Sequence, residues 1–86
     1  MAERTAVIAS RVGLHARPAM LFTQAVAASG ANVTIARPGQ EPVDASSILM
    51  VMSMGVKNGE EVVIASDSAA VLDQLVQMLE TDLDAP

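Results

Sequence analysis

The sequence predicts an α+β fold whose strands and helices follow one another in the order βαββαβα. Three observations support this prediction. Several short runs alternate apolar and polar residues, which is typical of half-buried strands. Two longer segments repeat apolar residues every three or four positions, as helices with one buried face do. Gly, Pro and Asn mark the turns between these segments. The chain has 86 residues, and we expect residues 1–86 to form a single domain without linkers or repeats.

The first two elements are a strand over residues 5–10 and a helix over residues 16–28. The strand shows only weak alternation. In the helix, Phe22 and Val26 recur at helical spacing, and Gly30 follows the last apolar residue. Glycine is the residue that most often ends a helix in the left-handed conformation. The helix is therefore expected to stop at this glycine.

A second strand is expected over residues 32–37, where Val33 and Ile35 alternate with polar or small residues. Residues 37–40 read Arg-Pro-Gly-Gln, with proline and glycine at the two central positions that a type II turn favours. A short third strand would follow over residues 41–43.

The second half of the chain is expected to hold a short helix after Ser47, a turn at Asn58-Gly59, a strand over residues 60–66 and a final helix. The final helix has the clearest pattern of the chain. Its apolar stripe is Leu72, Leu75, Val76, Leu79 and Leu83, and its polar side is Asp73, Gln77, Glu80 and Asp84.

Composition excludes several classes of function. The chain has no cysteine and one histidine, which excludes a disulfide, a thiolate zinc site and a histidine-rich metal site. We expect no metal site and no cofactor. No apolar run approaches the length of a membrane span, and the first residues do not resemble a signal peptide, so we expect a cytoplasmic protein without membrane insertion. Residues 1–40 carry a net charge of +3 and residues 41–86 one of −8, which add up to the total of −5. An acidic chain with Phe22 as its only aromatic residue is not expected to bind nucleic acid.

The six residues Gly-Leu-His-Ala-Arg-Pro at positions 13–18 are the strongest functional signal. They place His15 at the start of a helix, where unpaired backbone N–H groups and a partial positive charge favour an anion. Arg17 adds a donor that can bind phosphoryl oxygens through two hydrogen bonds. This setting suits reversible phosphorylation of the imidazole. Ala16 and Arg17 would form the phosphate cradle.

This hexapeptide resembles the active-site segment of HPr, the histidine phosphocarrier family of the bacterial phosphoenolpyruvate:sugar phosphotransferase system. A second segment, Ser-Ile-Leu-Met-Val-Met-Ser-Met-Gly at residues 47–55, is similar to the other signature of that family. The resemblance extends over essentially the whole chain. It implies an open-faced sandwich, in which a four-stranded antiparallel sheet is covered on one side by three helices. The resemblance also implies that the first helix begins near Ala16. Local rules predict that it begins at Pro18, because the residue before a proline avoids helical dihedrals. We follow the family here.

The resemblance further implies a phosphocarrier rather than an enzyme. His15 would accept the phosphoryl group on Nδ1 from the phosphorylated histidine of enzyme I and pass it to IIA domains of sugar permeases. Arg17 would orient and partly neutralise the group during transfer. We expect the protein to act as a monomer. Many family members have Ser or Asn at the position of Val12, whose side chain offers no hydrogen bond.

Ser47 aligns with a serine that a dedicated kinase phosphorylates in many Gram-positive bacteria, where it controls catabolite repression. A serine kinase or a transcriptional regulator is therefore a candidate partner, and Ser47 is a candidate regulatory phosphosite. Two neighbours depart from the family pattern: Ser46 stands where lysine is frequent, and Met50 where glycine is frequent. A second role needs no kinase, because serine is a preferred residue at the N-cap of a helix.

The helix after Ser47 is apolar almost all round, and a short helix cannot bury every face against one sheet. We expect Val51 and Met54 to point inward. Ile48, Leu49 and Met52 would then share another face and form a docking patch near His15, as the family resemblance implies. Ordinary core packing of these three residues is the alternative.

Two other functions stay open at this point. One is a specialised relative of HPr that uses the same histidine for signalling. The other is a small ligand-sensing domain in which His15 and Arg17 only bind an anion. The sequence does not say which sugars would be transported, because that specificity would belong to the permeases.

Overall fold

The computed structural model describes residues 1–83. Its elements follow the predicted order. They are β1 (Ala2–Val7), α1 (Ala16–Ser29), β2 (Val33–Ala36), β3 (Val43–Asp44), α2 (Ile48–Ser53), β4 (Glu61–Ser66) and α3 (Ala69–Leu79).

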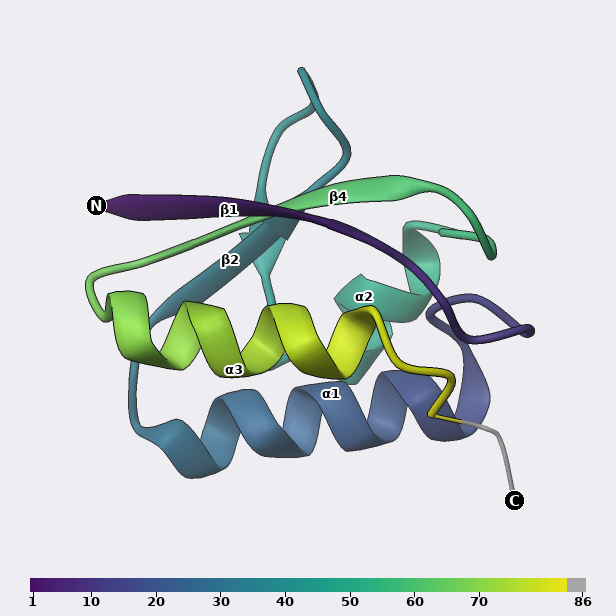
Figure 1. The fold of residues 1–86 in the computed structure, drawn as a ribbon, viewed down its shortest axis with the longest axis horizontal. Helices are drawn as coiled ribbons and strands as arrows, with labels where there is room; N and C mark the ends of the chain where they lie inside the picture. Colours follow the sequence, from purple (N-terminus) through teal and green to yellow (C-terminus); the bar gives the residue numbers. More distant parts are fainter. Residues whose placement is uncertain (84–86) are drawn as a thin grey trace.

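The four strands form one antiparallel sheet in the order β1-β4-β2-β3. β4 lies inside the sheet, where Ile64 pairs with Arg4 of β1 on one side and with Ile35 of β2 on the other. Figure 1 shows the three helices on one side of the sheet, with α1 and α3 side by side, while the opposite side carries no helix. This is the open-faced α+β sandwich that the family resemblance implied.

The core lies between the sheet and the helices. Alternate residues of the strands point into it, among them Ile35 and Ile64, and Ile8, which directly follows β1, joins them. Phe22 of α1 and Leu72 of α3 meet them from the helical layer. All five are almost completely buried. The periods of two in strands and 3.6 in helices therefore place these side chains together. Among residues 1–83, no helix is long and apolar enough to cross a membrane.

β1 begins and ends three residues earlier than the predicted strand over residues 5–10. The prediction was wrong at the end because the chain leaves the sheet after Ile8, whose N–H group still donates to the Glu60 carbonyl, while the Ala9 N–H group donates to Leu79 of α3. The predicted start was too late, because the strand also includes the charged residue Arg4. An edge strand tolerates this charge, and the Arg4 Nε atom lies 3.0 Å from Asp73 Oδ1 on α3.

α3 ends at Leu79, so the predicted extension of its apolar stripe to Leu83 is wrong. A longer helix would bond the Leu83 N–H group to the Leu79 carbonyl. In the structure that carbonyl accepts from Ala9, and the Leu83 N–H group donates to Ser10 Oγ at 2.9 Å. Ala9 and Ser10 thus occupy the Leu79 carbonyl and the Leu83 N–H group, which would otherwise bond to each other in a longer helix. Asp84, expected on the polar side of this helix, lies outside the described residues.

The region between β2 and β3 contains the predicted turn. The Gln40 N–H group donates to the Arg37 carbonyl at 2.9 Å, and Gly39 has a φ of 77°, which glycine adopts without strain. β3 starts at Val43 instead of residue 41, because Pro42 has no N–H group with which to enter the ladder.

Candidate functional site

His15 lies on the surface at the N-cap of α1, with extended backbone dihedrals (φ −142°, ψ 159°). Its carbonyl accepts the Ala19 N–H group at 3.5 Å, while its side chain makes no capping hydrogen bond. The first N–H groups of a helix have no acceptor within the helix, and Pro18 has no N–H group at all. Ala16 and Arg17 therefore carry the first backbone N–H groups of the helix after His15.

The helix starts at Ala16, as the family resemblance implied. Ala16 has a φ of 50°, the only positive value at a non-glycine residue within residues 1–83. A left-handed alanine costs about 1–2 kcal/mol. The sharp turn from extended His15 into α1 is concentrated at this one residue. Arg17 is thereby exposed in the first turn, two positions after the histidine.

The loop before His15 is held against the segment that follows α2. The Leu14 N–H group donates to the Val56 carbonyl at 3.0 Å, and the Leu14 side chain is buried. Gly13 has a φ of 73°, and a Cβ added to it would lie 2.3 Å from Val56 O and 2.8 Å from Lys57 Cα. Only glycine fits at this position. Gly13 and Leu14 therefore fix the backbone from which His15 projects.

Ser47 is the N-cap of α2, as its residue type predicted. Its Oγ accepts the Met50 N–H group at 3.3 Å. Among the α2 residues, Val51 is fully buried and Met54, which follows the helix, packs partly against the core, as expected.

The apolar surface of α2 differs from the expected one at Met52. Ile48 and Leu49 are exposed, and Leu49 shows 78% of its surface, but Met52 is half-buried against the core. Met50 is exposed as well. By helical spacing Met52 still shares a side of α2 with Ile48 and Leu49, whereas Ile48 and Met50, two positions apart, do not face each other. We call the exposed set of Ile48, Leu49 and Met50 the α2 patch.

Met20 is an exposed apolar residue for which no role was predicted. It lies on α1, which packs against α2, and it is exposed five positions after His15. The signal was present in the sequence, since the buried stripe of α1 contains Ala19, Phe22 and Val26 and leaves Met20 outside it.

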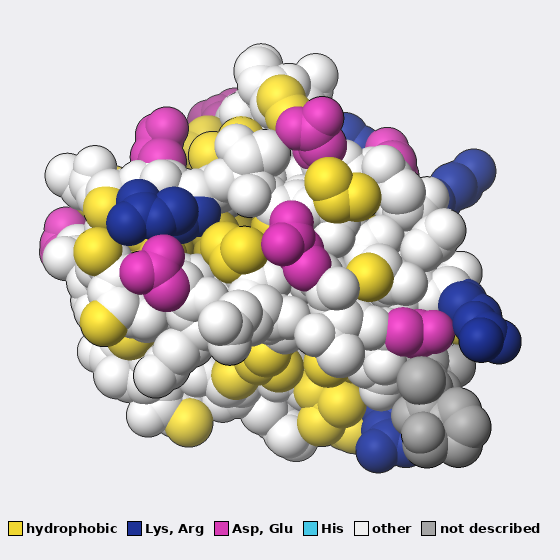
Figure 2. Space-filling model, viewed as in Figure 1, with side chains coloured by type: hydrophobic (Ala, Val, Ile, Leu, Met, Phe, Trp, Pro, Cys, Tyr) yellow, Lys and Arg dark blue, Asp and Glu magenta, His cyan; other side chains and the backbone are white. Residues whose placement is uncertain are grey.

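Positive charge gathers at the end of the molecule near the start of α1. On the face drawn in Figure 2, most Lys and Arg side chains lie at the right-hand end, where Figure 1 places the loop before α1. Arg11 in this loop pairs with Asp82 at 3.3 Å and keeps its side chain largely exposed. An acidic partner surface or a phosphate group would be attracted to this end.

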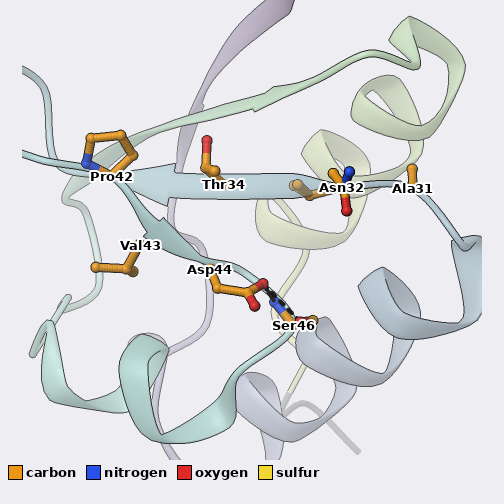
Figure 3. Close-up of a pocket in the computed structure, with 8 residues that line it drawn as sticks. Ala31, Asn32, Thr34, Pro42, Val43, Asp44 and Ser46 are labelled. Atoms are coloured by element: carbon orange, nitrogen blue, oxygen red, sulfur yellow. Dashed lines mark hydrogen bonds between the residues drawn. The ribbon is translucent and has the colours of Figure 1, made fainter.

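Two hollows in the surface lie away from His15. One, of about 340 Å³, is at the edge formed by β2 and β3, where Asp44 Oδ1 accepts hydrogen bonds from Ser46 N and Oγ at 2.9 and 2.7 Å (Figure 3). The other, of about 290 Å³, is lined by Thr34, Arg37 and Val63 among others. Neither includes His15 or Arg17. The site is an exposed surface, which suits contact with another protein better than enclosure of a small ligand.

The fold and the site define a small open-faced α+β protein that presents one histidine on its surface at the start of a helix. A family model described as the PTS HPr component phosphorylation site matches residues 2–81. The chain therefore belongs to the HPr family of phosphocarrier proteins of the phosphotransferase system.

Individual relatives agree with this assignment. The phosphocarrier protein HPr of Streptomyces coelicolor is 42% identical over 87 residues, which cover 98% of this chain and 94% of that protein. The phosphocarrier protein HPr of Mycoplasma capricolum is 35% identical over 79 residues, covering 92% and 86%. The crystal structure of HPr-C-His from Thermoanaerobacter tengcongensis superposes with a TM-score of 0.89 at 30% identity, covering 100% of this chain and 99% of that one.

Proposed function

We propose that this protein carries a phosphoryl group on His15 from enzyme I to the IIA domains of sugar permeases. The observation that carries the proposal is the exposed His15 at the N-terminus of α1 within a complete Gly-Leu-His-Ala-Arg-Pro segment. Membership of a phosphocarrier family supports it. The proposed role would place the protein in the cytoplasm.

In the proposed step, the lone pair of His15 Nδ1 attacks the phosphorus of the donor's phosphohistidine. A new P–N bond forms on His15, and the electron pair of the breaking P–N bond returns to the donor imidazole. The proton on His15 Nε2 stays in place. In the transfer to a IIA domain, a nucleophile of that domain attacks the phosphorus on His15, and the electron pair of the breaking P–N bond returns to Nδ1 of His15. Neither transfer involves oxidation, reduction or hydrolysis.

The surroundings of His15 would stabilise the group during this displacement. The Ala16 and Arg17 amides and the Arg17 guanidinium are the donors closest in sequence to the imidazole, and phosphoryl transfer depends mainly on positioned donors of this kind. The His15 side chain is exposed and does not cap the helix, as an imidazole that must be reached by a partner requires.

The α2 patch is proposed as the docking surface for both partners. Ile48, Leu49 and Met50 are exposed apolar side chains at successive positions of α2, and methionine-containing apolar surfaces adapt to partners of different shapes. A carrier must use one surface for a donor and for several acceptors. Ser47 needs no kinase to account for it, since its hydroxyl caps α2.

Incubation with enzyme I and phosphoenolpyruvate, followed by intact mass measurement, tests the proposal. We expect the wild-type protein to gain the mass of one phosphoryl group in an acid-labile form, and His15→Ala to gain none while remaining folded. Normal labelling of His15→Ala would remove His15 from its role. Absence of any adduct on the wild type would favour an anion-binding domain. Labelling without transfer to sugar-permease IIA domains would favour a specialised relative.

A further inference from the structure

Arg37, the residue that follows β2, donates hydrogen bonds from all three of its guanidinium nitrogens. The acceptors are backbone carbonyls after α2 and the Glu60 carboxylate. Its Nη1 donates to the Met54 carbonyl and its Nη2 to the Gly55 carbonyl at 3.0 Å. Nε and Nη2 also donate to the two carboxylate oxygens of Glu60, each at 3.2 Å. A planar guanidinium satisfies several fixed acceptors at once, and lysine cannot do so.

The carbonyls that Arg37 binds belong to Met54, the C-cap of α2, and to Gly55, the residue after it. The last carbonyls of a helix have no partners within the helix. α2 has six residues, too few to be stable without tertiary contacts. Its N-terminal end is capped by Ser47, and its C-terminal end is held by Arg37. The direction in which the α2 patch faces thus depends on this arginine.

Glu60 holds the segment that follows α2. Its Oε2 accepts the Lys57 N–H group at 2.6 Å, and its own N–H group donates to the Lys57 carbonyl at 3.1 Å. Residues 55–57 are therefore fixed by Arg37 at one end and by Glu60 at the other. This is the same segment whose Val56 carbonyl accepts from Leu14 and against which Gly13 packs.

We propose that Arg37 and Glu60 are a positioning pair that sets the α2 patch and the His15 loop relative to each other. The inference rests on the proposed function, in which a protein partner contacts the α2 patch while it reaches His15. The contacts run without a gap from Arg37 through residues 54–56 to Leu14, the neighbour of His15. A misplacement of about 1 Å between docking surface and reacting group costs up to about a hundredfold in rate.

Arg37→Gln tests the proposal with two phosphoryl donors of different size. Enzyme I has to contact α2, whereas the small donor phosphoramidate needs only His15 and its cradle. We expect kcat/KM for phosphorylation by enzyme I to fall about tenfold, while the rate with phosphoramidate stays unchanged. In ¹H–¹⁵N spectra, the amides of Leu14, Val56 and α2 should shift together.

Arg4→Gln is the matched control. Arg4 is as exposed as Arg37 (39% and 35% for the side chains) and also forms an ion pair with an acid, but its partner Asp73 lies on α3, away from residues 54–57. This variant should keep wild-type rates with both donors. Any thermal destabilisation common to the two variants measures the loss of an ion pair alone.

A folded Arg37→Gln protein with the wild-type kcat/KM for enzyme I would overturn the inference, and so would an equal loss with both donors. If Arg37→Gln does not fold, Arg37→Lys replaces it. Lysine keeps the charge but cannot reach the carbonyls and the carboxylate together, so a smaller loss restricted to enzyme I is expected and wild-type rates would again overturn the inference. Failure of the wild-type protein to accept a phosphoryl group from enzyme I would refute the proposed function instead, and the coupled amide shifts would still report on the positioning pair.

Discussion

His15 stands between two residues with unusual backbone requirements. Gly13 approaches the Val56 carbonyl so closely that a side chain has no room, and Ala16 adopts a left-handed φ. His15 itself has extended backbone dihedrals and an exposed side chain, while the backbone is held from both sides. A group that must be reached by protein partners gains from this combination, because the side chain is accessible and its origin is fixed.

Arg17 is the second residue on which the proposed chemistry depends. We expect Arg17→Ala to be phosphorylated by enzyme I more slowly and to pass the group on less efficiently. One lost hydrogen bond to a charged group is worth about 1.5–3 kcal/mol, which is about ten- to hundredfold in rate if the bond acts only in the transition state. Rapid-quench measurement of both transfer steps checks this, with Arg11→Ala as the control cation in the neighbouring loop. Unchanged rates for Arg17→Ala would leave it a surface charge.

At the scale of the element, α2 combines weak intrinsic stability with a proposed binding role. Six residues cannot hold a helix by themselves. Val51 anchors α2 in the core, Ser47 caps its start and Arg37 holds its end. The exposed Ile48 and Leu49 can then remain apolar on the surface, because the helix does not depend on their burial.

The cap gives a prediction that separates stability from transfer. Ser47→Ala should lower the free energy of unfolding by about 1 kcal/mol, whereas Ser47→Asp should barely change it, since aspartate caps helices well. Ser47→Asp should nevertheless slow transfer from enzyme I, because it adds negative charge next to the α2 patch. Chemical denaturation and transfer assays measure the two effects.

Ser68 provides the control for Ser47. It caps α3 in the same way, with its Oγ accepting the Val71 N–H group at 3.3 Å, but on a different helix. Ser68→Asp should leave transfer unchanged. If Ser47→Asp unfolds the protein and its folded fraction transfers normally, the serine is purely structural.

The exposure of Leu49 predicts a loss of binding without a loss of stability. Leu49→Asp should change the free energy of unfolding by no more than about 0.5 kcal/mol, as surface substitutions usually do. Transfer from enzyme I and to IIA domains should both weaken, because both would use the α2 patch. Val51→Asp gives the contrast, since a carboxylate buried without a partner costs several kcal/mol. Normal transfer by Leu49→Asp would exclude the docking role.

At the scale of the whole molecule, the polar contacts between β2, the end of α2 and β4 respond to pH. The hydrogen bond from Arg37, aided by the Lys57 N–H group, holds the pKa of Glu60 below its ordinary value of 4.5. A carboxyl with a lowered pKa in the folded state stabilises the fold above the pKa of the unfolded chain. This contribution is lost as the pH falls through the lower, folded value.

We therefore expect Glu60→Gln to be less stable than the wild type by a constant amount above about pH 4.5, and the difference to shrink as the solution is acidified further. Urea unfolding midpoints over a series of pH values measure this. Asp44, whose pKa is lowered by hydrogen bonds from the Ser46 backbone and side chain, is present in both proteins, so the difference isolates Glu60. A stability difference that is independent of pH through the acid range would show that Glu60 does not contribute through its charge.

Much of the fold and the centre of the site could be predicted because they depend on local chemistry. The period of the apolar residues in α1 and β4, the turn at residues 37–40 and the cap at Ser47 are each determined by residues within a few positions of one another. That His15 and Arg17 lie next to a helix start could also be predicted from adjacent residues, although local rules begin that helix at Pro18 and only the family resemblance begins it at Ala16.

The tertiary structure decided what depends on partners distant in the chain. α3 stops at Leu79 because Ala9 and Ser10 take the groups that would extend it, and local helix periodicity does not reveal those competitors. Met52 is half-buried and Met50 is exposed, because the elements packed against α2 determine how much of each of its sides is covered. Arg37 looked like an ordinary turn residue, and only the packing brings its guanidinium to Met54 and Gly55. The sequence by itself determined which groups are available for chemistry, while the tertiary structure decided which of them meet, since a hydrogen bond or a buried face needs a partner that sequence distance does not specify.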